Sequence, residues 1–292
     1  MSWLDPPLSA VRAVVARALA EDLGALGDLT AGLLPPGVAG SAVLSARAPG
    51  VLAGRLASTV AFSAVDPAIE VRWAAADGDR VVPDVAVARL SGPLGSILTA
   101  ERTALNLLCH LSGVATLTAR FVDAAAGRCA IRDTRKTTPG LRALEKAAVR
   151  AGGGVNHRGS LSEGILVKDN HRLHGSGPGG PGISGLVALA RRRWPGHGVE
   201  VECDDLEQVD EALAAGADMV LVDNMAPEQV AAAVRRVAGR VPVEVSGGVG
   251  LADVAAYAAA GADLIAVGAL THSAPVLDIG LDAWPGPVPL GV

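Results

Sequence analysis

The chain has 292 residues, a formal net charge of -5, and 50% hydrophobic but only 2% aromatic residues. This length can bury the core of one large or two medium domains, and that core is expected to consist of Ala, Val and Leu. The acidic balance argues against a protein that binds nucleic acid through its overall charge.

The three cysteines, Cys109, Cys129 and Cys203, lie far apart. Their spacing matches neither a zinc site nor a disulfide framework, so we expect a protein of the reducing cytoplasm. The N-terminus shows no basic segment followed by an apolar run, so no signal peptide is expected. No run of about 18 uncharged apolar residues occurs, so no membrane span is expected.

The first third of the chain predicts a mixed helix and sheet region. Residues 8–23 place apolar side chains at helical spacing. Short Val- and Ala-rich runs in 41–96, broken by Pro-Gly and Asp-Gly, predict a small and mainly antiparallel sheet with a helix near 55–64. Residues 98–126 are strongly helical, and we predict two helices that meet near Ser112-Gly113.

From residue 129 onward, strands and helices alternate. Strands are predicted at 129–133, 164–168, 198–203, 219–223, 242–246 and 263–267, with a seventh at 154–158. Helices are predicted at 141–151, 184–193, 205–215, 227–238 and 251–260. Buried, Val-rich strands in this rhythm predict a parallel α/β arrangement, which can close as a barrel or stay open. Six clear strands are too few for an eight-unit barrel. Residues 172–182 are predicted to be a flexible loop.

Basic residues concentrate in one part of this acidic chain. Residues 132–172 hold nine of the 25 Lys and Arg. They do not form a run: Arg135 and Lys136 follow an apolar stretch, Arg158 follows a glycine turn, and Lys168 ends another apolar run. This placement predicts a pocket for a small anionic ligand rather than a surface for nucleic acid.

Polar residues stand at or near the carboxyl ends of four predicted strands, at Lys168, Glu202, Asp223 and Ser246. In parallel α/β folds these ends form one face, where the active site lies. Glu202 and Asp223 offer the oxygen ligands that Mg²⁺ prefers, although either carboxylate could instead pair with a basic neighbour. Glu200 lies two residues before Glu202 on the same strand face and could take its role.

Glycines follow the last two predicted strands. Ser246 precedes Gly247 and Gly248, and Gly268 precedes Ala269. Glycine lets backbone N–H groups approach a phosphate, and a helix that begins at 251 would add its dipole. The pattern predicts a phosphate site, with a plain turn as the alternative.

Other polar residues point less clearly to chemistry. Arg142, Lys146 and Arg150 stand four residues apart and are expected on a solvated helix face. His110 lies in a predicted helix, where packing is as good an explanation as ligand binding. The sequence shows no Ser/His/Asp triad, no cysteine nucleophile and no glycine-rich dinucleotide fingerprint.

Several long motifs resemble the quinolinate phosphoribosyltransferases, also called carboxylating nicotinate-nucleotide pyrophosphorylases. The motifs are DTRKTTPGLRALEKAAVRAGGGVNHR (133–158), LVKDNH (166–171), VEVEC (199–203), LVDNM (221–225), VSGGV (245–249) and VGALTHS (267–273). The similarity extends from about residue 10 to about residue 282. Val245 is a mild departure, because the family usually has Ala or Ser before Ser-Gly-Gly.

This resemblance implies the architecture. We expect an incomplete parallel α/β barrel of six or seven strands over residues 106–274. A smaller, sandwich-like α+β domain is expected over residues 1–105, with its sheet completed by the tail 275–292.

The resemblance also implies the activity. The expected reaction transfers phosphoribosyl from 5-phosphoribosyl 1-diphosphate to quinolinate, with decarboxylation to nicotinate mononucleotide, as a step of NAD biosynthesis. It implies Mg²⁺ at Glu202 and Asp223, and catalytic roles for Lys136, Lys168, Glu202 and Asp223. The dicarboxylate would be held by Arg102, Arg135, His157 and Arg158, with Lys136 and Lys168 nearest the reacting centre. The phosphate would meet Ser246, Gly247, Gly248, Gly268 and Ala269. Arg102 would come from the partner subunit of a homodimer, with a hexamer as the alternative.

Three other functions stay open. A molybdenum-transport-associated branch shares the fold, but the complete basic set argues for quinolinate. A barrel isomerase or synthase acting on a phosphosugar would explain the glycines but not RKTTPG with GGGVNHR. A binding or regulatory barrel without turnover would not need Lys136, Lys168, Glu202 and Asp223 together.

Overall fold

The computed structural model describes residues 4–35, 37–175 and 182–287. The chain divides into two compact units. Unit 1 comprises residues 1–119, 137–153 and 270–292, and unit 2 comprises residues 120–136 and 154–269. The loop predicted at 172–182 falls mostly outside the described residues, and its residues 172–175 belong to helix α5 (Asp169–Gly175).

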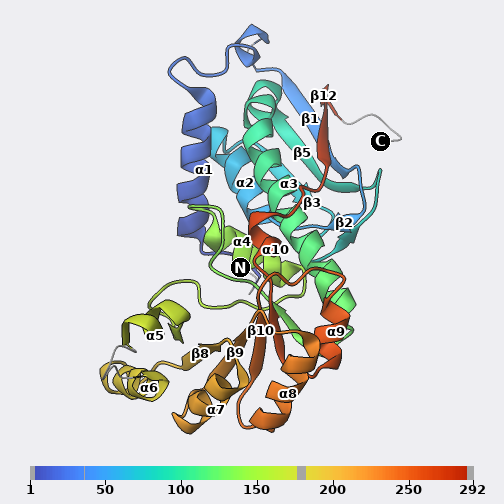
Figure 1. The fold of residues 1–292 in the computed structure, drawn as a ribbon. Helices are drawn as coiled ribbons and strands as arrows, with labels where there is room; N and C mark the ends of the chain where they lie inside the picture. The colour runs from blue at the N-terminus through green and yellow to red at the C-terminus, as the bar shows by residue number, and fades with distance from the viewer. Residues whose placement is uncertain (1–3, 36, 176–181, 288–292) are drawn as a thin grey trace. The chain divides into compact units, whose positions relative to one another are not determined.

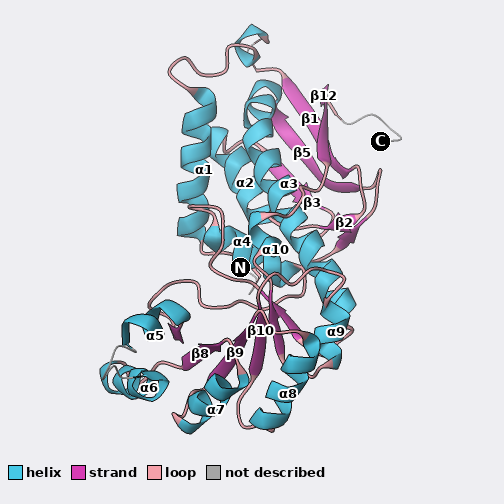
Figure 2. Cartoon of the chain, viewed as in Figure 1, coloured by secondary structure: helices cyan, strands magenta, loops and turns pink. Residues whose placement is uncertain are grey.

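Unit 1 is built on an antiparallel sheet with strand order β12-β1-β5-β3 (Figure 2). The strands are β1 (Ala39–Ala46), β3 (Glu70–Trp73), β5 (Ala86–Pro93) and β12 (Ile279–Pro285), and a separate pair joins β2 (Gly50–Val51) to β4 (Arg80–Val81). Its helices include α1 (Leu8–Leu23), the short 3-10 turn η1 (Ala31–Leu33) and α2 (Arg55–Val65). β12, late in the sequence, pairs with β1 over seven residue pairs, so unit 1 closes only when most of the chain exists.

The prediction of two helices in 98–126 is wrong, because one helix, α3 (Leu94–Ala125), covers the whole stretch. Gly113 does not end the helix. A Cβ at this position would collide with the backbone oxygen of Pro275, so the missing side chain admits a neighbouring segment. The Ser112 hydroxyl accepts a hydrogen bond from the Ala53 N–H at 3.0 Å and donates one to the Ala53 carbonyl at 3.1 Å. Close packing, not helix termination, explains this Ser-Gly pair.

α3 is also long and apolar enough to cross a membrane, but 61% of its most apolar window is buried inside the protein. Such burial is what a core helix of a globular domain requires.

The expected solvated face of α4 (Arg142–Ala151) is wrong as well. Lys146 is only 6% exposed. Arg142 donates from Nε to the Thr137 hydroxyl at 3.0 Å, and Arg150 donates to the Leu4 carbonyl at 3.1 Å. The four-residue spacing does put these side chains along one face, but that face packs inside unit 1 instead of meeting water.

Unit 2 contains one six-stranded sheet with strand order β6-β11-β10-β9-β8-β7, and all five pairings are parallel (Figure 1). The strands are β6 (Ala130–Arg132), β7 (Ile165–Val167), β8 (Val199–Cys203), β9 (Met219–Asp223), β10 (Val243–Ser246) and β11 (Leu264–Ala266). The predicted fold class is confirmed. The seventh strand at 154–158 is reduced to one parallel bridge between Arg132 and Val155.

Helices lie between these strands: α6 (Gly182–Arg193), α7 (Leu206–Ala214), α8 (Pro227–Val237) and α9 (Val254–Ala259), followed by α10 (Ala269–His272). α6, α7 and α8 pack against the strands next to them. The helix predicted from 251 begins at Val254, because residues 251–253 form a turn in which Asp253 accepts the Gly250 N–H at 3.0 Å.

Alternation along the strands gives the sheet two different faces. One face carries Val201, Val220, Val222 and Val245, each at most 1% exposed. The other face carries the polar side chains of the same strands.

Candidate active site

The polar face of the unit 2 sheet gathers charges from three strands. Glu200 and Glu202 come from β8, Glu244 from β10 and Arg132 from β6. Strand register pairs Glu202 with Leu221, and Leu221 is in turn the partner of Glu244. Residues in register share a face, so these charged groups project to the same side. That side is where chemistry can occur in this unit.

Lys168 and Glu202 form an ion pair across this face, with Lys168 Nζ donating to Glu202 Oε2. Glu202 is buried, whereas 43% of the Lys168 side chain stays exposed. The Lys168 backbone N–H also donates to His171 Nδ1 at 2.9 Å, which ties the end of β7 to the start of α5. A cation held by a buried carboxylate but open to solvent can meet an incoming anion.

Asp223 and Ser246 end neighbouring strands in register with each other. Oδ2 of Asp223 accepts from the Asn224 amide at 2.6 Å, and the Asn224 backbone N–H donates to the Ser246 carbonyl at 3.0 Å. Gly247 then turns with φ +101, and a Cβ there would lie 2.6 Å from the Asn224 backbone nitrogen. Only glycine fits this close approach of two strand ends.

The segment of His157 and Arg158 is anchored by a buried carboxylate. Asp133, fully buried after β6, accepts the His157 backbone N–H at 2.8 Å and the Asn156 amide at 2.6 Å. Arg158 donates to the Gly164 carbonyl at 2.8 Å. Burial lowers the pKa of Arg158, and the neighbouring Arg135 lowers it further. Two guanidinium groups held close enough to repel each other favour binding of an anion between them.

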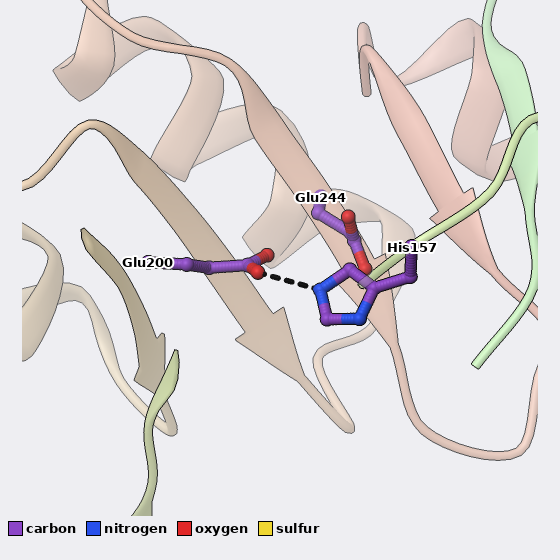
Figure 3. A group of neighbouring side chains, drawn as sticks. All are labelled: His157, Glu200 and Glu244. Carbon is purple, nitrogen blue, oxygen red and sulfur yellow. Dashed lines mark hydrogen bonds and ion pairs between the residues drawn. The ribbon is translucent and has the colours of Figure 1, made fainter. Parts of the chain in front are cut away.

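The His157 ring belongs to a buried cluster that sequence reasoning missed (Figure 3). Its Nε2 lies 2.8 Å from Oε2 of Glu200, and ligand atoms of His157, Glu200 and Glu244 all lie within 4.8 Å of one another. Arg132 donates to Glu244 Oε2. Burial and the nearby Glu200 raise the pKa of Glu244 to about 7, although Arg132 opposes the shift.

A cavity of about 440 Å³ opens beside this cluster, and Arg132, His157, Arg158 and Glu200 are among its lining residues. Glu202, Asp223 and Ser246 do not belong to its described lining. His157 and Arg158 therefore line one cavity, whereas Arg135, Lys136 and Lys168 do not belong to its described lining. The predicted metal and phosphate residues stand nearer the carboxyl ends of their strands.

Comparison with known families accounts for both units. The family model described as quinolinate phosphoribosyl transferase, N-terminal domain, matches residues 28–112, and the model of the C-terminal domain matches residues 114–282.

The chain belongs to the quinolinate phosphoribosyltransferase family.

Individual relatives support the same assignment to the quinolinate phosphoribosyltransferase family. The nicotinate-nucleotide pyrophosphorylase [carboxylating] of Mycobacterium leprae is 43% identical, over 95% of this chain and 99% of the relative. A probable enzyme of the same name from Bacillus subtilis is 40% identical, over 90% of this chain and 89% of the relative. The solved nicotinate-nucleotide pyrophosphorylase of Francisella tularensis is 36% identical, with a TM-score of 0.90 over 96% of this chain and 98% of that chain.

Several residues expected from the family resemblance do not belong to the described lining of the cavity. Arg102 belongs to unit 1, where its side chain is 65% exposed and lies 3.5 Å from Glu101. Lys136 is exposed at the end of a unit 2 segment, and its backbone N–H donates to the Thr134 hydroxyl at 3.0 Å. Gly268 and Ala269 follow β11 at the start of α10.

The donor set also suits the Mg²⁺ that the family resemblance implies. Glu202 and Asp223 stand on adjacent strands, and each offers carboxylate oxygens, the ligand type that Mg²⁺ prefers. Both carboxylates of β8 have a partner, and Glu202 fits better because it stands nearer the carboxyl end of β8, next to the strand that ends at Asp223.

Among the residues that the sequence analysis did not single out, Glu244 could have been found from its position. It stands two residues before Ser246 in a Val-rich strand, where a charged residue is costly unless it is paired. Asp133 and Arg132 could not have been found in this way, because their partners lie far along the chain.

Proposed function

We infer that this protein transfers the phosphoribosyl group of 5-phosphoribosyl 1-diphosphate to the ring nitrogen of quinolinate and releases the 2-carboxylate as carbon dioxide. The bond from the ring nitrogen to the anomeric carbon forms while the bond from that carbon to the diphosphate breaks. Loss of carbon dioxide leaves its electron pair on the ring carbon, which takes a proton from solvent. The supporting observation is a family match in both units of a chain whose polar sheet face carries paired cations and carboxylates.

The dicarboxylate is proposed to bind at Arg135, His157 and Arg158. Guanidinium forks bind carboxylates through two parallel hydrogen bonds, so two of them suit a ring with two carboxylates. The mutual repulsion that lowers the pKa of Arg158 would be relieved when the dianion arrives. Binding of this kind also fixes the ring nitrogen near the donor, and preorganised geometry lowers the barrier.

Lys136 and Lys168 are proposed to stabilise the charge that develops on the diphosphate. Glu202 and Asp223 would hold Mg²⁺, which when bound supplies further charge stabilisation for the diphosphate. Glu202 has a second function here, because it holds Lys168 at the open end of the sheet. Neither lysine needs to form a covalent intermediate.

The 5-phosphate of the donor is proposed to bind at the glycine turns. Ser246 ends β10 and is followed by Gly247 and Gly248, and Gly268 and Ala269 follow β11. The positive φ of Gly247 and Gly248, +101 and +60, gives these turns conformations that L side chains rarely adopt. Such turns allow backbone N–H groups to face a phosphate.

The proposed assembly is a homodimer in the cytoplasm, with a hexamer as the alternative, and neither nucleic acid nor membrane is a proposed partner. Arg102 would serve the site of the partner subunit. Its large exposure within unit 1 supports such a role. Mixed dimers of Arg102→Ala and Lys136→Ala chains should regain part of the activity, because one of their two sites would carry both native residues. Failure to regain any would contradict the cross-subunit role.

The reaction is tested by incubating the protein with quinolinate, 5-phosphoribosyl 1-diphosphate and Mg²⁺ while carbon dioxide and nicotinate mononucleotide are followed together. Equal rates of both products, with an inactive Lys136→Ala variant, support the proposal. A folded protein that binds the donor but forms neither product would show that the acceptor is wrong, as the molybdenum-associated alternative requires.

A further inference from the structure

The His157 residue is held at two separate points by two buried carboxylates. Asp133 accepts its backbone N–H at 2.8 Å, and Glu200 lies 2.8 Å from Nε2 of the ring. Only about a tenth of the side chains of His157 and Glu200 is exposed. One carboxylate thus places the main chain and the other orients the imidazole.

Glu200 makes its contact with the ring through one oxygen. The other oxygen, Oε1, is buried without a hydrogen-bond partner among the described residues. A buried carboxylate oxygen without a partner is costly, so its retention needs a compensating function. Both Glu200 and His157 line the cavity of about 440 Å³ that also contains Arg158.

The same atoms could in principle hold a metal ion, since His157, Glu200 and Glu244 bring ligand atoms within 4.8 Å of one another. Arg132 argues against it, because its guanidinium donates to Glu244 and also lies 3.4 Å from the Met219 sulfur. A divalent cation would have to compete with this guanidinium for Glu244. The cluster is better explained as a network of protein groups.

We propose that Glu200 is a positioning residue for substrate recognition, which accepts a hydrogen bond from Nε2 of His157 and so fixes the orientation of the ring beside Arg158 in the cavity. A carboxylate oxygen accepts a hydrogen bond from a ring N–H, so we assign the shared hydrogen to Nε2. This bond at Nε2 fixes the orientation of the ring in the cavity that it lines together with Arg158, and its loss would release the ring from that orientation. This role rests on the proposed binding of a dicarboxylate at His157 and Arg158.

Kinetics of Glu200→Gln test the role, since Gln has nearly the same shape without the charge. We expect KM for quinolinate to rise about tenfold or more, and KM for 5-phosphoribosyl 1-diphosphate to stay within about twofold. In a His157→Ala background, Glu200→Gln should add no further rise, because its effect passes through the ring. Glu228→Gln, an exposed exchange in the first turn of α8, is the matched control. An unchanged KM for quinolinate, or full additivity with His157→Ala, would overturn the proposal.

A second measurement does not depend on turnover. With ¹⁵N-labelled histidine, the wild-type protein has six histidines to resolve. The His157 signal, identified by its loss in His157→Gln, should show Nε2 protonated in wild type and a mixture of tautomers in Glu200→Gln. A wild-type ring protonated only at Nδ1 would contradict the proposal, as would one zinc ion bound per chain and lost in Glu200→Gln.

The two proposals fail in different ways. A wild-type protein without turnover but with Nε2 protonated would contradict the proposed reaction alone. An active protein in which Glu200→Gln leaves KM for quinolinate unchanged would contradict the positioning role alone.

Discussion

Asp133 Oδ1 accepts the backbone N–H of His157 at 2.8 Å, although 24 residues separate the two along the chain. Oδ2 of the same carboxylate accepts from Asn156 at 2.6 Å, and Asp133 is fully buried. This carboxylate joins the end of β6 to the segment that would otherwise be a seventh strand. Its hydrogen bonds replace the ladder that the segment forms only once, at Val155.

Replacing Asp133 by Ala should therefore damage both stability and substrate binding. The change leaves the partly buried N–H of His157 without its acceptor, which costs about 1–3 kcal/mol of the free energy of unfolding. Urea unfolding measures that loss, and steady-state kinetics should show a raised KM for quinolinate. Asp133→Asn, which keeps one carbonyl oxygen, should lose less on both counts. Equal stability of wild type and Asp133→Ala would refute the anchoring role.

The ion pair of Lys168 with Glu202 predicts coupled losses of activity. Lys168→Ala removes a cation proposed to face the diphosphate, so kcat/KM should fall about 100- to 1,000-fold. Glu202→Gln should also reduce kcat/KM, because Lys168 loses its charged partner. The double variant should lose less than the product of the two single losses, since the two residues act as one unit. Independent, multiplicative losses would argue that the ion pair has no catalytic function.

The turn at Gly247 should not tolerate a side chain. Gly247→Ala forces a non-glycine residue to φ +101 and places its Cβ 2.6 Å from the Asn224 backbone nitrogen. We expect a loss of about 1–3 kcal/mol in the free energy of unfolding from backbone strain, with a raised KM for 5-phosphoribosyl 1-diphosphate.

Two other glycines serve as controls for that variant. Gly248→Ala has φ +60 but open space around the new Cβ, so a smaller loss is expected. Gly196→Ala has neither a positive φ nor a neighbour within 4 Å and should leave stability and KM unchanged. If Gly247→Ala behaved like Gly196→Ala, the turn would have no special role.

Glu244 predicts a specific dependence of stability on pH. Its pKa is raised from 4.5 to about 7, mainly by burial and then by Glu200. At pH values between 4.5 and about 7, the Glu244 carboxyl is mostly ionised in the unfolded chain but still protonated in the folded protein. The folded state therefore loses stability as the pH rises through this range. From about pH 5 to about pH 8 the contribution amounts to roughly 2–3 kcal/mol.

Urea unfolding at several pH values tests this prediction. Glu244→Gln cannot ionise, so its stability should fall less than that of wild type over the same pH range. Glu228→Gln, exposed on α8, should follow the wild-type curve. Parallel curves for Glu244→Gln and wild type would mean that the carboxyl of Glu244 does not bind its proton more tightly in the folded protein.

The sequence by itself predicted the elements of unit 2 and the polarity of its sheet. Alternation in VEVEC puts Glu200 and Glu202 on one face and valines on the other, because successive side chains of a strand point to opposite sides. Runs of Val between helical segments predicted a parallel sheet, whose carboxyl ends lie at one edge. Long motifs such as RKTTPG with GGGVNHR were specific enough to predict the family.

Only the tertiary structure decided which charges meet. His157 and Glu200 are 43 residues apart, and Arg132 and Glu244 are 112 apart, so their pairing depends on strand order and stagger rather than on local spacing. The same holds where local patterns misled. Gly113 resembled a helix end, and Lys146 resembled a solvated lysine. In both cases packing against distant segments overrode the local preference, because burial and close contact depend on the whole fold while propensity depends on neighbours in sequence.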